Sequence, residues 1–203
     1  MIQHMNRFQR SSLVLIIALF LFACNGTDRT ASQNPKDSTQ SVSEGLLPDD
    51  QLLIPGKSAG RFLINDPDSI VITALGKPDF SNAAMGKAVL VWYPGGKQDQ
   101  PLSIFTARDM GNDETARIQQ IRITSPEFHT FQAIGVGSSL REISNAYSLQ
   151  IVETYEQDGQ IYTVYNANEG IAFEVDSAYR CMAVIIHKAD ASIPNYLPLR
   201  DRP

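Results

Sequence analysis

The stretch INDPDSIVITALGKPDFSNAAMGKAVLVWY (residues 64–93) decides the predicted fold. A second stretch, VGSSLREISNAYSLQIVETYEQDGQIYTVY (residues 136–165), aligns with it without gaps when the sequence is shifted by 72 residues. This shift places Ile64 on Val136, Val71 on Ile143, Val89 on Ile161 and Tyr93 on Tyr165. Further on, the spacing falls to 68 and then to 63, as shorter turns in the second copy would require. The pattern predicts an internal repeat.

Each copy opens with the signals of one short helix. In the first copy, Asp66 provides a side-chain acceptor at the N-cap, Pro67 suits the first helical position and Gly76 ends the helix. In the second copy, Ser139 and Glu142 have the spacing of a capping box.

Stretches of β-branched and aromatic residues follow each helix, and short turn signals separate them. The turn signals are Gly86-Lys87, Pro94-Gly95-Gly96, Gly111-Asn112-Asp113, Asp158-Gly159, Asn168-Glu169-Gly170 and Asp176-Ser177. We therefore expect an α+β fold made of two tandem copies, residues 52–128 and 129–190. Each would contain one short helix and an antiparallel sheet of about four strands, and the two sheets either join into one or stay separate.

The apolar pattern of the strands predicts which of them are covered. Residues 88–93 and 181–186 are apolar on both faces, as expected for strands covered on both sides. Residues 118–123 alternate instead, with Gln120 and Arg122 on one face. We expect this strand to lie nearer an edge or the solvent.

The N-terminus has the organisation of a secretory signal. Arg7 and Arg10 precede an apolar run of 11 residues, Leu13–Ala23, which is too short to span a membrane. The sequence Leu21-Phe22-Ala23-Cys24 resembles the lipobox of bacterial lipoproteins at three of four positions. The resemblance implies cleavage between Ala23 and Cys24 and acylation of Cys24; the alternative is an ordinary secretory signal followed by an accidental cysteine. Residues 1–23 are thus expected to be a signal peptide.

The composition after the signal agrees with an envelope protein. Residues 24–51 would form the lipidated cysteine and a polar, disordered tether. Removing residues 1–23 takes away two arginines and no acid, so the net charge of −5 becomes −7. An acidic chain without a basic stripe is a poor nucleic-acid binder. Residues 191–203 would be a proline-rich tail, either extended against the domain through Ile193, Tyr196 and Leu197 or frayed.

The sequence contains few residues suited to catalysis or to metal binding. His129 and His187 have no zinc-motif spacing, and Ser138-Ser139 are explained as helix caps. Asp66 and Asp68 lack the rest of a calcium loop. Cys181 lies in an apolar strand and is expected in the core. We expect no cofactor, no metal and no catalytic residues.

Trp92 is the side chain singled out for binding. One interpretation places it in the core, under a helix or between the copies. The other makes it an aromatic platform together with Tyr162, which occupies the corresponding strand face of the second copy, for a protein or glycan partner.

Two segments, IPGKSAGRFLINDPDSIVITALGKPD (54–79) and FHTFQAIGVGSSLREISNAYS (128–148), carry a resemblance to a known superfamily. They resemble the tandem-repeat starts of the superfamily that contains the β-lactamase-inhibitor protein and the small lipoprotein of the β-barrel assembly machinery. The matching sequence motifs are Val136-Gly137-Ser138 and Leu75-Gly76-Lys77-Pro78. The resemblance implies an antiparallel sheet and a non-catalytic binding role.

The expected function is therefore that of a lipid-anchored scaffold or protein-binding lipoprotein, held in the outer membrane by acyl chains on Cys24, facing the periplasm and binding an envelope protein. Two alternatives stay open. One is an envelope enzyme whose site is assembled only in space, and the other is a binder of a glycan or small ligand that uses an aromatic sheet face.

Overall fold

The computed structural model describes residues 49–191, which belong to one compact unit. The predicted signal peptide, Cys24, nearly all of the tether and the tail beyond Ala191 lie outside the described residues. The described residues contain two short α-helices, α1 (Asp68–Leu75) and α2 (Leu140–Ala146), with two 3-10 turns, η1 (Asp49–Gln51) and η2 (Pro94–Gly96). Neither α-helix is long and apolar enough to cross a membrane.

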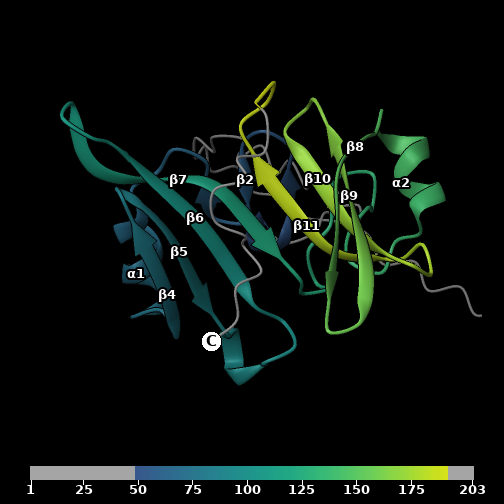
Figure 1. The fold of residues 1–203 in the computed structure, drawn as a ribbon, viewed down its shortest axis with the longest axis horizontal. Helices are drawn as coiled ribbons and strands as arrows, with labels where there is room; N and C mark the ends of the chain where they lie inside the picture. The colour runs from purple at the N-terminus through teal and green to yellow at the C-terminus, as the bar shows by residue number, and fades with distance from the viewer. Residues whose placement is uncertain (1–48, 192–203) are drawn as a thin grey trace, which may run out of the picture. The chain divides into compact units, whose positions relative to one another are not determined.

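Eight strands form one antiparallel sheet (Figure 1). They are β4 (Phe80–Ala84), β5 (Lys87–Trp92), β6 (Leu102–Asp109), β7 (Asp113–Ile123), β8 (Gln150–Gln157), β9 (Gln160–Ala167), β10 (Ile171–Asp176) and β11 (Cys181–His187). Their order across the sheet is β4-β5-β6-β7-β11-β10-β9-β8. The six turn signals of the sequence fall at the six connections within the β4–β7 and β8–β11 runs, so the predicted strand segmentation is confirmed.

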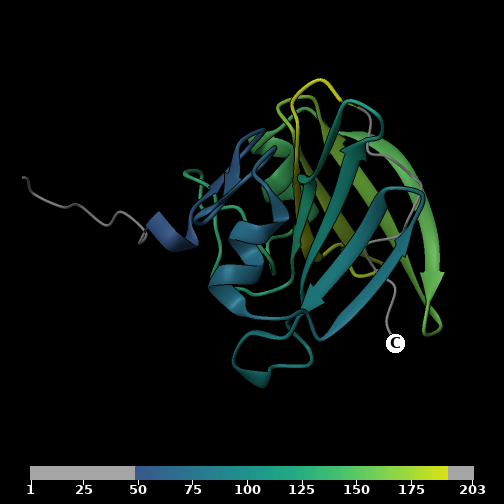
Figure 2. The same ribbon diagram turned by 90° about the vertical axis from the view of Figure 1, so that its left-hand side faces the viewer.

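A second, three-stranded sheet contains β1 (Leu53–Ile54), β2 (Ser58–Ala59) and β3 (Phe62–Leu63). This small sheet and both helices lie on one face of the large sheet (Figure 2). At the contact between the sheets, the Gly56 N–H donates to the Gly170 carbonyl at 3.0 Å. A Cβ on Gly170 would approach the Gly56 Cα to 2.6 Å, so glycine permits this close packing.

The expectation of an α+β fold made of two tandem helix-plus-sheet copies is wrong. The protein is mostly β, because the two helices contain only 8 and 7 residues. The strands also belong to a single sheet, which β7 and β11 join through the register Val184↔Ile123 to His187↔Gln120. Sequence reasoning further missed the three-stranded sheet, whose two-residue strands are too short for a periodic pattern.

The helix ends follow the sequence in part. The Ser139 side chain and Glu142 form the predicted capping box at α2, and Gly76 ends α1 as expected. The predicted capping role of Asp66 is wrong, because the N-cap residue of α1 is Pro67 and no side chain caps it.

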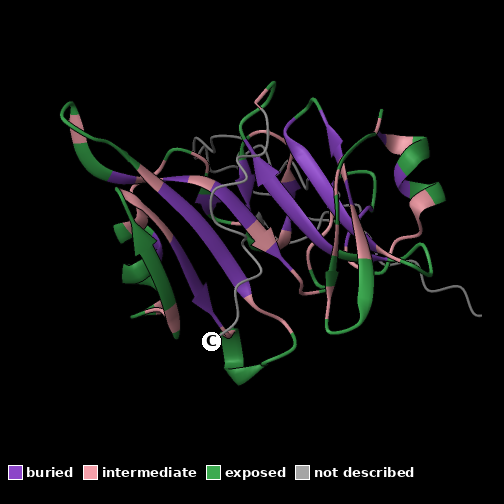
Figure 3. Ribbon diagram, viewed as in Figure 1, coloured by how far each residue is buried: buried purple, intermediate pink, exposed green. Residues whose placement is uncertain are grey.

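The two faces of the large sheet both carry buried side chains, and the interior strands are buried along much of their length (Figure 3). We call the face under the helices and small sheet the helix-side face. Its core includes Val71 of α1, Ile143 of α2 and Phe173 of β10. We call the opposite face the helix-free face; its buried cluster is Val89, Val91, Phe105, Val164, Ala172 and Ile185.

The prediction that residues 118–123 lie near an edge or the solvent is wrong. They belong to β7, which pairs with β6 on one side and β11 on the other. Its two polar residues, Gln120 and Arg122, face the helix-free side and are largely buried, with Gln120 only 2% exposed. The alternation of apolar and polar residues in 118–123 gave a wrong prediction because the charge of Arg122 is paired with Glu174 inside the protein rather than exposed to water.

Candidate functional site

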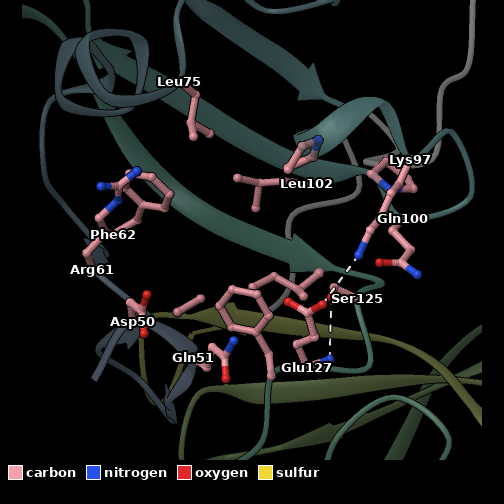
Figure 4. Close-up of a pocket in the computed structure, with 15 residues that line it drawn as sticks. Asp50, Gln51, Arg61, Phe62, Leu75, Lys97, Gln100, Leu102, Ser125 and Glu127 are labelled. Carbon is pink, nitrogen blue, oxygen red and sulfur yellow. Dashed lines mark hydrogen bonds and ion pairs between the residues drawn. The ribbon is translucent and has the colours of Figure 1, made fainter. Parts of the chain in front are cut away.

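A cleft of about 330 Å³ opens on the helix-side face, between the small sheet, the end of α1 and the large sheet (Figure 4). Its floor is apolar and combines residues from β2, β3, α1, β6 and β7 with one loop residue. The apolar lining residues are Ala59, Phe62, Leu75, Leu102, Ile123 and Phe128, with Pro94 and Pro101 at the side. The volume lies at the lower end of the range for ligand sites, and it suits one or two large side chains or a small molecule.

The small sheet shapes one wall of the cleft. Gly60 has a φ of +55°, and a Cβ at this position would collide with the Asp50 carbonyl and approach the Phe128 ring to 3.2 Å. Glycine thus allows the β2–β3 turn to pack against η1. The next residue, Arg61, places its guanidinium 5.2 Å from the centre of the Phe62 ring, so the arginine lies over an aromatic side chain of the floor.

The rim of the cleft carries charges of both signs. The Lys97 Nζ lies 3.3 Å from Glu127 Oε1, and both side chains are about half exposed, at 51% and 54%. Asp50 and Arg61 add one further charge of each sign on the other side of the cleft. An exposed pair such as Lys97–Glu127 contributes little to stability and can open to a ligand at small cost. The rim can therefore supply both donors and acceptors around an apolar floor.

The ionisable side chains that line the cleft are Asp50, Arg61, Lys97 and Glu127. No histidine, cysteine or tyrosine lines it. Within residues 49–191, no group of three histidine, cysteine or acidic side chains is arranged to hold a metal ion. The arrangement is suited to holding an apolar group.

The structure does not bring Trp92 and Tyr162 together. Trp92 is 3% exposed in the helix-side core, and its Nε1–H donates to the Gly76 carbonyl at 3.0 Å, which ties β5 to the end of α1. Tyr162 lies on the helix-free face, where its ring stacks on Tyr155 at 5.2 Å. The two side chains therefore form no shared platform.

The two histidines of the described chain have structural positions. The backbone of His129 joins the small sheet, accepting from the Leu53 N–H at 2.9 Å. His187 is buried on the helix-free face, with Nε2 2.8 Å from Asn166 Oδ1 and Nδ1 2.9 Å from the Lys188 carbonyl. Burial lowers the pKa of His187, although the contact with the Lys188 carbonyl opposes this.

The other singled-out residues lie in turns, caps or the core. The Ser138 Oγ accepts from the Gly135 N–H at 3.1 Å, next to the Ser139 cap. The Asp66 carbonyl accepts from the Ile118 N–H, and Asp68 lies in the first turn of α1. Cys181 is fully buried, as predicted, and burial raises the pKa of its thiol to about 12.

Sequence reasoning missed both the cleft and a buried ion pair. Arg122 Nη2 lies 2.7 Å from Glu174 Oε2, and the Tyr155 hydroxyl donates to the same oxygen at 3.1 Å. Burial alone would lower the pKa of Arg122, but the Glu174 carboxylate raises it above its ordinary value. The two partners are 52 residues apart, so no local pattern could reveal the pair. An arginine and a glutamate inside otherwise apolar strands were the available signal.

No protein-family model matches this chain, and no curated protein sequence is detectably similar to it. Two solved structures are similar over part of their length. One is a cysteine-rich secretory protein from Staphylococcus aureus subsp. aureus Mu50, with 15% identity and a TM-score of 0.42 over 70% of this chain. The other is an extracellular protein containing an SCP domain from Bacillus anthracis str. Ames, with 8% identity and a TM-score of 0.41 over 63% of this chain.

The chain spans less than half the length of these proteins, 48% and 44% respectively. At such identities and TM-scores, the similarity assigns neither a fold family nor an activity to this chain.

Proposed function

We propose that this chain is a lipid-anchored, non-catalytic binding protein of the bacterial envelope, which holds a protein partner through the cleft between its two sheets. The observation that carries the proposal is the apolar floor of the cleft inside a rim of mixed charge. Binding energy at protein interfaces concentrates in a few large side chains that fill such pockets, while polar groups at the rim exclude water and set orientation.

The sequence supports the remaining parts of the proposal. The lipobox-like Leu21-Phe22-Ala23-Cys24 provides the anchor, and 24 mostly polar residues (25–48) separate Cys24 from the described unit. The resemblance of residues 54–79 and 128–148 to the superfamily of the β-lactamase-inhibitor protein and the small β-barrel-assembly lipoprotein agrees with a binding role. We propose an outer-membrane location facing the periplasm on the same basis.

Site-specific photo-cross-linking in cells tests the cleft directly. A photoreactive amino acid replaces Gln100 at the rim of the cleft, and a second chain carries it at Glu156, an exposed position on β8 away from the cleft. We expect a discrete cross-linked protein from position 100 and none from position 156. Identical adduct patterns at both positions, or no adduct at position 100, would refute binding through the cleft.

A filling substitution separates a specific contact from proximity. Leu75 lines the cleft and is partly exposed, so Leu75→Trp places an indole in the space that a partner side chain would fill. Leu75→Met keeps the side-chain volume and serves as the matched control. We expect the tryptophan variant to abolish the adduct at position 100 and the methionine variant to retain it, with both variants showing the thermal unfolding of the parent protein. An adduct that survives Leu75→Trp contradicts the proposal.

A further inference from the structure

The helix-free face of the large sheet is buried although no helix or strand among residues 49–191 covers it. Val89 and Ala172 have no exposed surface, and Phe105 is 3% exposed. Figure 2 places both helices and the small sheet on the opposite side. An antiparallel sheet with one solvated face alternates apolar and polar residues, whereas β5 is apolar on both faces. This face is therefore built to lie against a further segment.

The polar groups on this face also indicate a cover. The Arg122–Glu174 pair has side chains only 12% and 1% exposed. Gln120 is buried beside it on β7, and its Nε2 has no hydrogen-bond partner among residues 49–191. A buried amide without a partner costs about 1–3 kcal/mol. The covering segment is expected to offer acceptors, such as main-chain carbonyls.

We propose that the C-terminal segment of this chain, residues 192–203 (SIPNYLPLRDRP), packs across the helix-free face. The segment begins directly after Ala191, which follows the interior strand β11. Adjacent strands lie about 4.8 Å apart, so the edges of the sheet are about 14 Å (β8) and 19 Å (β4) from β11. Twelve extended residues reach about 37–40 Å, so the segment is long enough to cross to either edge.

The chemistry of the segment fits this face. Ile193, Tyr196, Leu197 and Leu199 supply apolar side chains for the cluster of Val89, Phe105 and Ala172. Its prolines favour an extended backbone, which lowers the entropy lost on docking. Proline also has a carbonyl but no N–H, so such a segment offers Gln120 acceptors while burying few unpaired donors. The polar tether before residue 46 contains few residues that could fill an apolar face.

Thiol accessibility in the full chain tests the proposal. Val164→Cys and Ala172→Cys each place one thiol on the helix-free face, at positions 2% and 0% exposed. Both are made with Cys24→Ser, and the buried Cys181 serves as an internal control for the integrity of the fold. A bulky water-soluble maleimide is added, and labelling is followed by mass spectrometry. We expect slow labelling in the full chain and labelling about ten-fold faster or more in a chain that ends at Ala191.

Point substitutions keep the test valid if the shortened chain loses its fold and exposes Cys181. In the full-length chain, Tyr196→Ser with Leu197→Ser should accelerate labelling at position 164, whereas Asn195→Ser should not. Equal labelling rates with and without these changes would overturn the proposal. Fast labelling of the full-length cysteine variants would also overturn it. Protection that appears only as protein concentration rises would overturn it too, because it would show that a second copy covers this face. The cleft lies on the other face, so these outcomes do not bear on the proposed function.

Discussion

Glu174→Gln tests the buried ion pair between Arg122 and Glu174. The change removes the negative charge beside Arg122 and nearly preserves the size of the side chain. In the parent protein, Arg122 donates to Glu174 through Nε at 3.0 and 3.1 Å and through Nη2 at 2.7 Å. Only 12% of its side chain is exposed, so water can replace the carboxylate only in small part.

The size of the effect follows from this burial. Breaking a buried pair while leaving one charge in place costs about 3–5 kcal/mol. Because Arg122 keeps some exposure, we expect about 3 kcal/mol, which corresponds to roughly 6–12 °C in Tm for a chain of this size. Urea unfolding followed by circular dichroism measures the loss of free energy of unfolding.

Two comparisons make the reasoning refutable. Asp113→Asn weakens the exposed pair between Asp113 and Arg117, whose side chains are 41% and 36% exposed, and should lower the free energy of unfolding much less than Glu174→Gln does. Arg122→Met combined with Glu174→Leu should recover at least half of the loss, because it removes both buried charges. If Glu174→Gln costs no more than Asp113→Asn, Arg122 is solvated and the assignment of a buried pair is wrong.

Three further predictions concern the anchor, a buried histidine and the tryptophan. Cys24→Ser should release the protein from the membrane fraction, and mass spectrometry of the parent should detect acyl chains on Cys24; an unmodified, soluble parent would refute the anchor. Burial lowers the pKa of His187 below its ordinary 6.5, so the unfolded state binds the proton more readily and the free energy of unfolding falls as pH drops below about 6.5. His187→Gln should flatten this dependence in urea titrations from about pH 7.5 to about pH 5, and parallel curves for parent and variant would contradict it. Trp92→Phe removes the donor to the Gly76 carbonyl and part of the ring, so Tm should fall by an amount equivalent to about 1–2 kcal/mol, and an unchanged Tm would show that this bond is dispensable.

Much of the local structure was predictable because its causes lie within a few residues. The capping box of Ser139 and Glu142 works through atoms three positions apart, and Asp158-Gly159 sets its hairpin by its own backbone preferences. The apolar run of 88–93 also predicted a strand that is apolar on both faces, and β5 has buried side chains on both faces. The core position of Cys181 followed from the same kind of pattern.

The candidate site could not be predicted in this way. The cleft takes Phe62 from the small sheet, Leu75 from α1 and Leu102 from β6, and nothing in the sequence near any of them signals the others. Of the two interpretations of Trp92, the core position is the one that the structure shows, because the indole donates to the end of α1 and is not exposed as a platform. A residue type can suggest binding, but only packing decides whether it is accessible.

The sequence by itself determined where the strands of the large sheet begin and end, where α1 ends and where α2 begins. It also determined the apolar pattern of β5 and β11, because these features depend on turn chemistry, capping and side-chain alternation. Only the tertiary structure decided that β7 pairs with β11, which joins all eight long strands into one mostly β protein. The same pairing brings β7 close enough to β10 for Arg122 to meet Glu174. This pairing joins segments about 60 residues apart. It is stabilised by the side chains that become buried when the strands meet, rather than by any local preference of the residues.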